Sequence, residues 1–229
     1  MIPRPAATVM LVRSTPYEPE VLMIERPARG FFGGLWVFPG GGLEPIDHEN
    51  IARRAVRAPD GVDDLSWRAA ALRETAEEVG LAITDPELIE PVTAIGVGVF
   101  ETVLSRGAVL DGERLRLVSQ WVTPEGAPTR FDTRFYVAVL DSDPDLVPQP
   151  GEVIDTAWIR PAEALDRMER QEWALVTPTI HHLQWLARHA DIDSIWHAAG
   201  QALGSRVEPV VEYDGSEVRI QLPTAAELP

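Results

Sequence analysis

The chain has 229 residues, a formal net charge of −16 and no cysteine, and 45% of its residues are hydrophobic. This length fits one folded domain with an extension, and no apolar run approaches the roughly 20 residues that cross a bilayer. The missing cysteines exclude disulfides and thiolate sites, and the acidity argues against a broad nucleic-acid surface, which needs positive charge. We expect a cytoplasmic protein without nucleic-acid or membrane partners, and a homodimer stays open.

Short apolar runs predict paired strands at the start of the chain. The runs cover residues 7–13 and 21–26, and the turn-rich residues 14–19 separate them. A glycine-dense stretch follows at residues 30–42, where the backbone can approach a ligand or a metal closely. Residues 43–64 mix proline, glycine and charged residues, so we interpret them as an inserted loop with room for one short helix.

A helix is predicted at residues 67–79. Acidic and serine residues before it can act as caps, and Gly80 can end it. Its alanine, leucine and valine residues give it a buried side. Glu74, Glu77 and Glu78 stand at positions i, i+3 and i+4, which places the three carboxylates on one face.

The second half of the chain contains further strands and then helices. Residues 92–105 fit either a helix or a strand. Apolar alternation and β-branched residues predict strands at 115–122, 131–140 and 153–159. The elements predicted after them are helices that begin at Pro161, Thr177 and Ile192, and a hairpin over residues 207–222 that turns at Asp214 and Gly215.

The acidic face of the predicted helix has two interpretations. On a solvated helix each pair of like charges costs roughly 0.2–0.5 kcal/mol, and acids near the C-terminal end also oppose the helix dipole. A hard dication bound to the carboxylates would reverse both penalties, and Mg²⁺ and Mn²⁺ prefer oxygen ligands. Periodicity alone leaves a solvated face and a metal site as equal alternatives.

The sequence around this helix resembles the Nudix hydrolase family. Residues 73–81, Arg-Glu-Thr-Ala-Glu-Glu-Val-Gly-Leu, match the second half of the Nudix box, with Thr75 at a hydrophobic position. Phe-Pro-Gly-Gly at residues 38–41 resembles the approach to the box. The resemblance implies a single Nudix domain over residues 1–229, with a Nudix-type α/β/α sandwich around a mixed sheet. A helical C-terminal extension from about residue 161 to residue 229 would end in the hairpin.

The spacing inside the box indicates a subgroup. Gly41 and Arg73 are farther apart than in the family pattern, which places an insertion at about residues 43–64. A Nudix subgroup similar to the animal peroxisomal coenzyme A diphosphatases has such an interrupted box. Its members also carry segments similar to Trp-Val-Thr-Pro at residues 121–124 and Arg-Phe-Asp-Thr-Arg-Phe-Tyr at residues 130–136. This resemblance implies coenzyme A or acyl-coenzyme A as the substrate.

The resemblance also implies metal-binding and catalytic residues. Glu74, Glu77 and Glu78, together with the Gly41 carbonyl, would hold Mg²⁺ or Mn²⁺, which would bind the pyrophosphate of a small-molecule substrate. The same three glutamates are the candidate catalytic residues. One of them, or Glu152 from a later loop, would orient or deprotonate the attacking water.

Three residues of the box have implied structural roles. Asp47 falls at the position of the first box glutamate when Gly41 is taken as the first box glycine. Arg73 would hold the preceding loop through a carboxylate such as Asp47 or Glu49. Gly80 closes the helix.

Candidate substrate-binding residues border the glycine stretch. Arg26 and Arg29 could hold phosphates with two hydrogen bonds each, and exposed surface arginines are the alternative interpretation. The coenzyme A signature before Phe-Pro-Gly-Gly is met in part, because Gly30 stands where its second arginine would be. Gly40 and Gly41 are expected to bring the backbone close to the substrate.

Other polar and aromatic residues are interpreted as structural. The adjacent His181 and His182 fit packing or surface roles better than ligation. Trp173, Trp185 and Trp196 are spaced through helical segments and are expected in the core.

Two further functional hypotheses stay open. One is a Nudix hydrolase of ADP-ribose, another dinucleotide or a nucleotide sugar, because the fold serves many substrates. The other is a Nudix-derived binding module without turnover. The three box glutamates argue against a binding module, which has no need of an acidic face.

Overall fold

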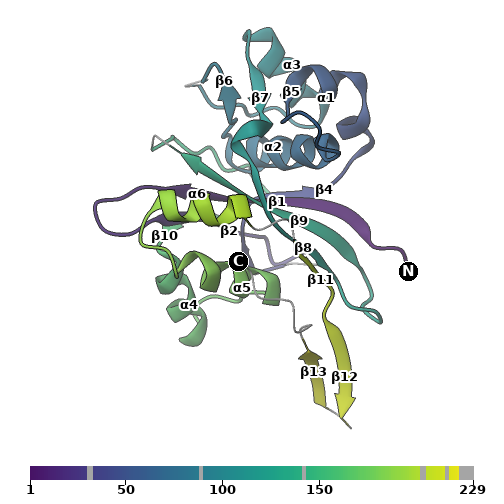
Figure 1. Ribbon diagram of the computed structural model, residues 1–229, viewed down its shortest axis with the longest axis vertical. Helices are drawn as coiled ribbons and strands as arrows, with labels where there is room; N and C mark the ends of the chain where they lie inside the picture. Colours follow the sequence, from purple (N-terminus) through teal and green to yellow (C-terminus); the bar gives the residue numbers. More distant parts are fainter. Residues whose placement is uncertain (30–32, 88–89, 141–142, 202–204, 215–216, 222–229) are drawn as a thin grey trace.

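The computed structural model describes residues 1–29, 33–87, 90–140, 143–201, 205–214 and 217–221. Its main sheet has eight strands in the order β10-β2-β1-β9-β8-β11, with β3 beside β2 and β4 beside β1 (Figure 1). The strands are β1 (Arg4–Arg13), β2 (Glu20–Glu25), β3 (Trp36–Val37), β4 (Gly40–Gly42), β8 (Arg116–Val122), β9 (Phe131–Leu140), β10 (Asp155–Ile159) and β11 (Ser205–Val207).

Strand β1 lies in the middle of this sheet and is buried on both sides. It pairs in parallel with β9 along ten residues, from Arg4 opposite Phe131 to Arg13 opposite Leu140, and antiparallel with β2 and β4. Successive side chains of a strand point to opposite faces, so β1 supplies apolar residues to two cores. The sheet is therefore mixed and needs a helical layer on each face.

Helices cover the two faces as the sequence predicts (Figure 1). Helix α2 (Leu65–Val79) packs on one face, and α1 (Asn50–Ala55) and α3 (Val97–Ser105) pack against α2 and against each other on its far side. The other face is covered by α4 (Pro161–Glu169), α5 (Thr177–Leu186) and α6 (Ile192–Gln201). This arrangement confirms the expected α/β/α sandwich. No helix within the described ranges is both long enough and apolar enough to cross a bilayer.

The insertion is more ordered than the loop that we expect from its composition. It contains the 3₁₀ turn η1 (Pro45–His48), helix α1 and strand β5 (Val56–Arg57). Strand β5 pairs in parallel with β7 (Val109–Asp111), which also pairs with β6 (Thr84–Asp85), and α1 packs against α3. The short helix for which the prediction leaves room is present as α1, whereas η1 and β5 replace part of the expected loop, because partners distant in sequence stabilise these short elements.

The remaining differences lie at element ends and in the C-terminal part. Residues 97–105 form helix α3, which decides the ambiguous segment, and η2 (Gly112–Arg114) precedes β8. Strand β11, which the sequence did not indicate, adds in parallel to the edge at β8. The expected hairpin is present as β12 (Val210–Asp214) and β13 (Glu217–Gln221), and Gly215 of its predicted turn is outside the described residues.

Candidate active site

Helix α2 places the three glutamates beside the glycine strand β4. Small residues at 69–71 and at Ala76 are fully buried, so the helix packs closely against β1 and β4. The helix ends at Gly80, whose φ of 73° is left-handed and favours glycine. Thr75, the unusual residue of the box, is buried and donates its hydroxyl to the Ala71 carbonyl at 2.8 Å. A polar side chain is thereby accommodated at an apolar position.

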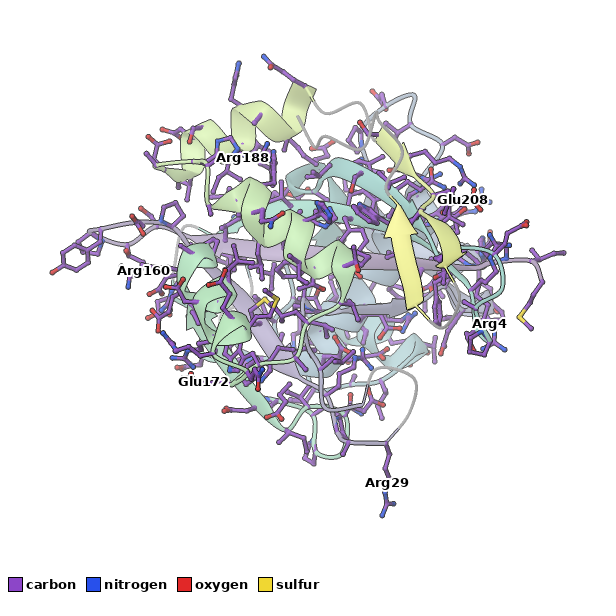
Figure 2. All side chains as sticks on the ribbon, turned by 90° about the horizontal axis from the view of Figure 1, so that it is seen from below. Arg4, Arg29, Arg160, Glu172, Arg188 and Glu208 are labelled. Carbon is purple, nitrogen blue, oxygen red and sulfur yellow. The ribbon has the colours of Figure 1, made fainter. Side chains whose placement is uncertain are left out.

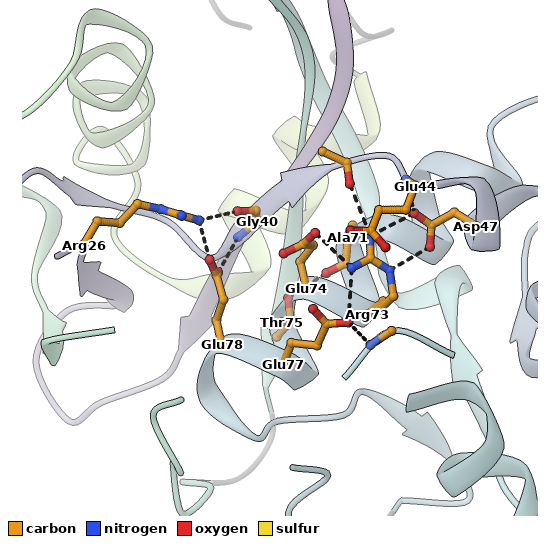
Figure 3. A network of polar contacts seen from close by, with 12 residues as sticks. Arg26, Gly40, Glu44, Asp47, Ala71, Arg73, Glu74, Thr75, Glu77 and Glu78 are labelled. Atoms are coloured by element: carbon orange, nitrogen blue, oxygen red, sulfur yellow. Dashed lines mark hydrogen bonds and ion pairs between the residues drawn. The ribbon is translucent and has the colours of Figure 1, made fainter. Parts of the chain in front are cut away.

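Glu78 is fully buried and connects the helix to Arg26, directly after β2, and to strand β4 (Figure 3). One carboxylate oxygen forms an ion pair with Arg26, and the other accepts a hydrogen bond of 2.8 Å from the Gly40 amide. The same guanidinium donates to the Gly40 carbonyl at 2.8 Å. Arg26 therefore lies at the site, but it is bound to a glutamate and to the backbone.

Arg73 is the centre of a second set of contacts and is only 1% exposed. Its guanidinium donates two hydrogen bonds of 2.9 Å to the fully buried Asp47. The nitrogen Nη1 contacts Glu74 at 2.9 Å and Glu77 at 3.1 Å, and Nη2 donates to the Gly42 carbonyl at 3.2 Å (Figure 3). Arg73 thus holds the inserted segment, the glycine strand and two of the glutamates together.

Two backbone positions fit closely around these carboxylates. A Cβ atom at Gly41 would clash with the Glu74 carboxylate, so any other residue there would force Glu74 to rotate away from its position in the cluster. A Cβ at Gly40 would clash with the backbone of Ala7 and Thr8. The Gly96 amide at the start of α3 donates to Glu77 at 2.7 Å, a contact that no sequence motif indicated.

The glutamates are difficult to ionise in this environment. Burial raises the pKa of Glu78 to about 8, although the charge of Arg26 opposes the shift. Burial likewise raises the pKa of Glu74 to about 7, against the effect of Arg73. The pKa of Glu77 is also raised by burial. Arg26 and Arg73, which contact these glutamates, therefore do not compensate the negative charge that the three carboxylates would carry.

The contacts define an acidic cluster with more negative than positive groups. It consists of Asp47, Glu74, Glu77 and Glu78 against Arg26 and Arg73. Four carboxylates face two guanidinium groups, an excess that one divalent cation would balance. All donors are oxygens, the ligands that Mg²⁺ and Mn²⁺ prefer. The donor set therefore fits a hard dication.

The carboxylates are directed at protein partners in the described arrangement. Within the described ranges, no three His, Asp or Glu side chains already converge on a common metal position. Glu74 and Glu77 share one nitrogen of Arg73. A cation would have to replace such contacts by rotation of glutamate side chains.

The loop that carries Glu152 docks on the end of α2. The amides of Val147 and Gln149 donate to the carbonyls of Val79 and Glu78 at 2.8 and 2.9 Å. Glu152 is exposed, and its charge contributes to the raised pKa of Glu78. The structure thus brings Glu152 near the acidic cluster through this loop.

Arg29 is placed differently from the other predicted substrate-binding residues. It is exposed and projects from the molecular surface (Figure 2). The other three, Arg26, Gly40 and Gly41, line a cavity of about 500 Å³ between the sheet and the start of α5. Sequence reasoning missed this cavity, because its other walls come from strands and from the C-terminal helices.

The histidines and tryptophans of the C-terminal helices are packed. His182 is fully buried and stacks on Phe135 with 4.1 Å between ring centroids. Its Nδ1 donates to the Pro178 carbonyl at 2.7 Å, and Ser119 donates to Nε2 at 2.8 Å. Burial lowers the pKa of His182 to about 3, so the ring is neutral. His181 is half-buried beside Trp121.

Trp173 stacks on Trp36 at 3.9 Å, and Trp185 is fully buried. Trp196 is half-buried under the Arg116 guanidinium, 3.9 Å from its ring centroid. These aromatic residues pack in or against the core on the α4–α6 side.

Comparison with known proteins identifies the class. The model of the NUDIX domain matches residues 2–178, and the chain therefore belongs to the NUDIX domain family. A crystal structure of a NUDIX hydrolase from Alicyclobacillus acidocaldarius is 29% identical, with a TM-score of 0.75, and the match covers 86% of this chain and 96% of that one.

Among curated relatives, human acyl-coenzyme A diphosphatase NUDT19 is 26% identical over 233 residues, 76% of this chain and 62% of the human protein. Putative nudix hydrolase 7 of Caenorhabditis elegans is 27% identical over 202 residues, 83% of this chain and 62% of that protein. The chain thus spans less than two thirds of the length of these relatives.

Proposed function

We propose that this protein is a divalent-metal-dependent pyrophosphohydrolase that acts on coenzyme A or acyl-coenzyme A. The observation that carries the proposal is the acidic cluster on α2, where mostly buried carboxylates lie against the glycine strand β4. Its excess of negative charge fits a dication, and the adjoining cavity offers space for a substrate. Hydrolysis would add one water across the P–O–P bridge and yield two phosphomonoesters.

The protein groups have separate tasks in this proposal. Glu74, Glu77, Glu78 and the Gly41 carbonyl would hold Mg²⁺ or Mn²⁺. When bound, the metal ions neutralise charge on the pyrophosphate and lower the pKa of water. Arg73 positions two of the glutamates through its contacts of 2.9 and 3.1 Å.

Arg26 is the candidate phosphate contact. It lines the cavity and lies at the acidic cluster, so a bound pyrophosphate could take the place of Glu78 as its partner. Such an exchange would leave Glu78 available to a cation. Arg29 projects from the molecular surface and does not line the cavity, so Arg26 is preferred over it as the phosphate contact.

Glu152 is the candidate proton acceptor. It is exposed, and its loop is fixed to the C-terminal end of α2 by two backbone hydrogen bonds. The box glutamates are the alternative acceptors. A pH–rate profile of Glu152→Gln distinguishes them, since loss of the acidic limb, the fall in rate at low pH caused by protonation of the base, is expected only if Glu152 takes the proton.

Coenzyme A is the preferred substrate class in this proposal for two reasons. The human relative is named an acyl-coenzyme A diphosphatase. In addition, residues 121–124 and 130–136, which resemble the coenzyme A subgroup, contribute Trp121, Pro124 and Phe131 to the cavity. The cytoplasmic location and the homodimer remain predictions.

The proposal is tested by turnover of coenzyme A, acetyl-coenzyme A, ADP-ribose and NADH with Mg²⁺, with Mn²⁺ and with EDTA. We expect metal-dependent release of adenosine 3′,5′-bisphosphate from coenzyme A to be fastest. Fast turnover of ADP-ribose without cleavage of coenzyme A would contradict the substrate assignment and retain the enzyme class. No turnover of any compound would favour a binding module.

A further inference from the structure

The cavity beside the acidic cluster has an unusual composition for a site that receives a highly charged substrate. Its floor comes from β1, β8 and β9, and its opposite wall from residues 175–179 before and within the first turn of α5. Arg26 is the only ionisable residue among the lining residues that the structure describes, and it lies at the end shared with Gly40 and Gly41. Away from that end, the walls are apolar side chains, prolines and threonines.

Charge complementarity determines which part of coenzyme A this cavity suits. The adenosine part carries a 3′-phosphate, which needs cationic partners or several donors. The pantetheine arm is uncharged and consists of alkyl segments joined by two amides. A cavity with an arginine at one end only fits a chain that begins at the pyrophosphate and continues without charge. Its volume of about 500 Å³ is within the range of small-molecule sites.

Trp121 supplies a buried donor to the cavity wall. The residue is 3% exposed and lines the cavity, and its indole Nε1 has no hydrogen-bond partner among the residues that the structure describes. A buried polar group without a partner is costly. This nitrogen is not accessible to water in the structure. A hydrogen-bond acceptor would therefore have to approach it from the cavity, after a small rotation of the indole ring. An amide carbonyl is a suitable acceptor.

The start of α5 adds a second polar feature to the same wall. Thr177 and Thr179 line the cavity at the N-terminus of this ten-residue helix, where the helix dipole favours acceptor groups. Thr179 is 3% exposed. Together with Trp121 on β8, these residues offer donors to neutral acceptors on two sides of an otherwise apolar space.

We propose that this cavity binds the pantetheine arm of the substrate, and that Trp121 Nε1 donates a hydrogen bond to one of its amide carbonyls. This inference rests on the proposed coenzyme A activity and adds to it the orientation of the substrate. The adenosine 3′,5′-bisphosphate part then lies outside the cavity, on the other side of the Arg26 and Gly40 contact. Trp121 is a specificity-determining residue in this arrangement.

The first test measures binding of pantetheine by isothermal titration calorimetry in EDTA, so that hydrolysis plays no part. We expect the wild type to bind pantetheine, and adenosine 3′,5′-bisphosphate not to displace it. Trp121→Phe keeps an aromatic ring but removes the donor, and should weaken binding about three- to tenfold. Thr133→Leu, which narrows the cavity from β9 without changing Trp121, should also weaken it.

Trp173→Phe is the matched control, because Trp173 stacks on Trp36 and does not line the cavity. It should bind pantetheine like the wild type. Circular dichroism and thermal unfolding should show all three variants folded. Displacement of pantetheine by adenosine 3′,5′-bisphosphate, or unchanged binding in both Trp121→Phe and Thr133→Leu, would overturn the inference.

The second test compares KM values. In Trp121→Phe, KM for coenzyme A should rise about three- to tenfold, and KM for ADP-ribose, which lacks the pantetheine arm, should rise less. An equal rise for both substrates would show a general structural effect and contradict the specific contact. If the wild type does not cleave coenzyme A, the proposed function fails. If it cleaves coenzyme A but does not bind pantetheine, only this inference fails.

Discussion

The two ends of helix α2 both hold charged side chains away from solvent, but they balance them differently. At the N-terminal end, Asp64 accepts hydrogen bonds from Arg68 at 2.7 Å and from the Tyr136 hydroxyl at 2.9 Å. Arg68 also donates to the carbonyls of Gly112 and Leu115 at 2.6 and 2.7 Å. Asp64 and Arg68 are thus paired with each other, and each also hydrogen-bonds to neutral polar groups.

At the C-terminal end the acidic cluster has twice as many carboxylates as guanidinium groups. Burial raises the pKa of Glu74 to about 7 and that of Glu78 to about 8. Buried charge is thus compensated by partners at one end of this helix and is left in excess at the other. The N-terminal network stabilises the fold, whereas the uncompensated charge of the acidic cluster is the feature on which we base the proposed metal site.

The largest expected effect is on stability at the N-terminal end. Arg68→Ala leaves Asp64 buried without its closest cation and two carbonyls without a donor. Breaking such a buried pair costs about 3–5 kcal/mol, and urea unfolding followed by circular dichroism measures it. Below the unfolding transition, kcat should stay within about threefold of the wild type. A large loss of kcat in folded protein would contradict the separation of the two ends.

Glu78→Gln should produce the opposite pattern. It removes a proposed metal ligand without leaving a charge buried, so we expect kcat to fall about 10²- to 10³-fold. The free energy of unfolding in EDTA at pH 8 should be unchanged or higher, because the cost of burying the carboxylate disappears. Glu169→Gln, on the exposed surface of α4, is the control. Undiminished Mg²⁺-dependent turnover in Glu78→Gln would refute the catalytic assignment.

The stability of the metal-free protein should depend on pH through the acidic cluster. Because the folded pKa values of Glu74 and Glu78 lie above the ordinary value near 4.5, both groups favour the folded state when protonated. This contribution is complete below about pH 4.5 and is lost as the pH rises towards about 8.

In EDTA, we therefore expect the wild type to lose on the order of 2 kcal/mol relative to Glu78→Gln between pH 5 and pH 8. Urea unfolding of both proteins across this range measures the difference, and saturating Mg²⁺ should reduce it. A wild type that gains stability relative to Glu78→Gln over the same range would contradict the shifted pKa of Glu78.

The smallest expected effect belongs to Tyr136→Phe. It removes one hydrogen bond to Asp64, while Arg68 remains as the partner of that carboxylate. A loss of about 1 kcal/mol is expected in urea unfolding. Metal dependence and KM should match the wild type, and a change in either would show that the N-terminal network influences the acidic cluster.

The sequence predicts the parts of the molecule that depend on local pattern. Helix α2 and strand β9 follow from periodicity, and Gly80 at the end of α2 follows from its special backbone conformation. The shared face of the three glutamates follows from helix geometry alone. The pairing of Arg73 with Asp47, 26 residues apart, was anticipated only through the family resemblance.

Contacts between distant segments could not be derived in this way. Strand β4 consists of Gly40–Gly42 and has no strand-forming side chains, so its pairing with β1 depends on the backbone. The two-residue strand β5 exists because β7 is beside it. Arg26 contacts Glu78 across 52 positions of the sequence, and the cavity at Trp121 is lined by residues from distant parts of the chain. A local sequence pattern therefore indicates neither of them.

The parallel pairing of β1 with β9 has a consequence for synthesis of the protein. The first strand of the chain stays without its longest partner until residues 131–140 have left the ribosome. Parallel strands that are distant in sequence pair slowly, and an apolar strand that is still unpaired is prone to aggregation. A nascent chain that ends before residue 131 should therefore depend on chaperones, and ribosome-bound chains arrested before and after β9 should differ sharply in protease resistance.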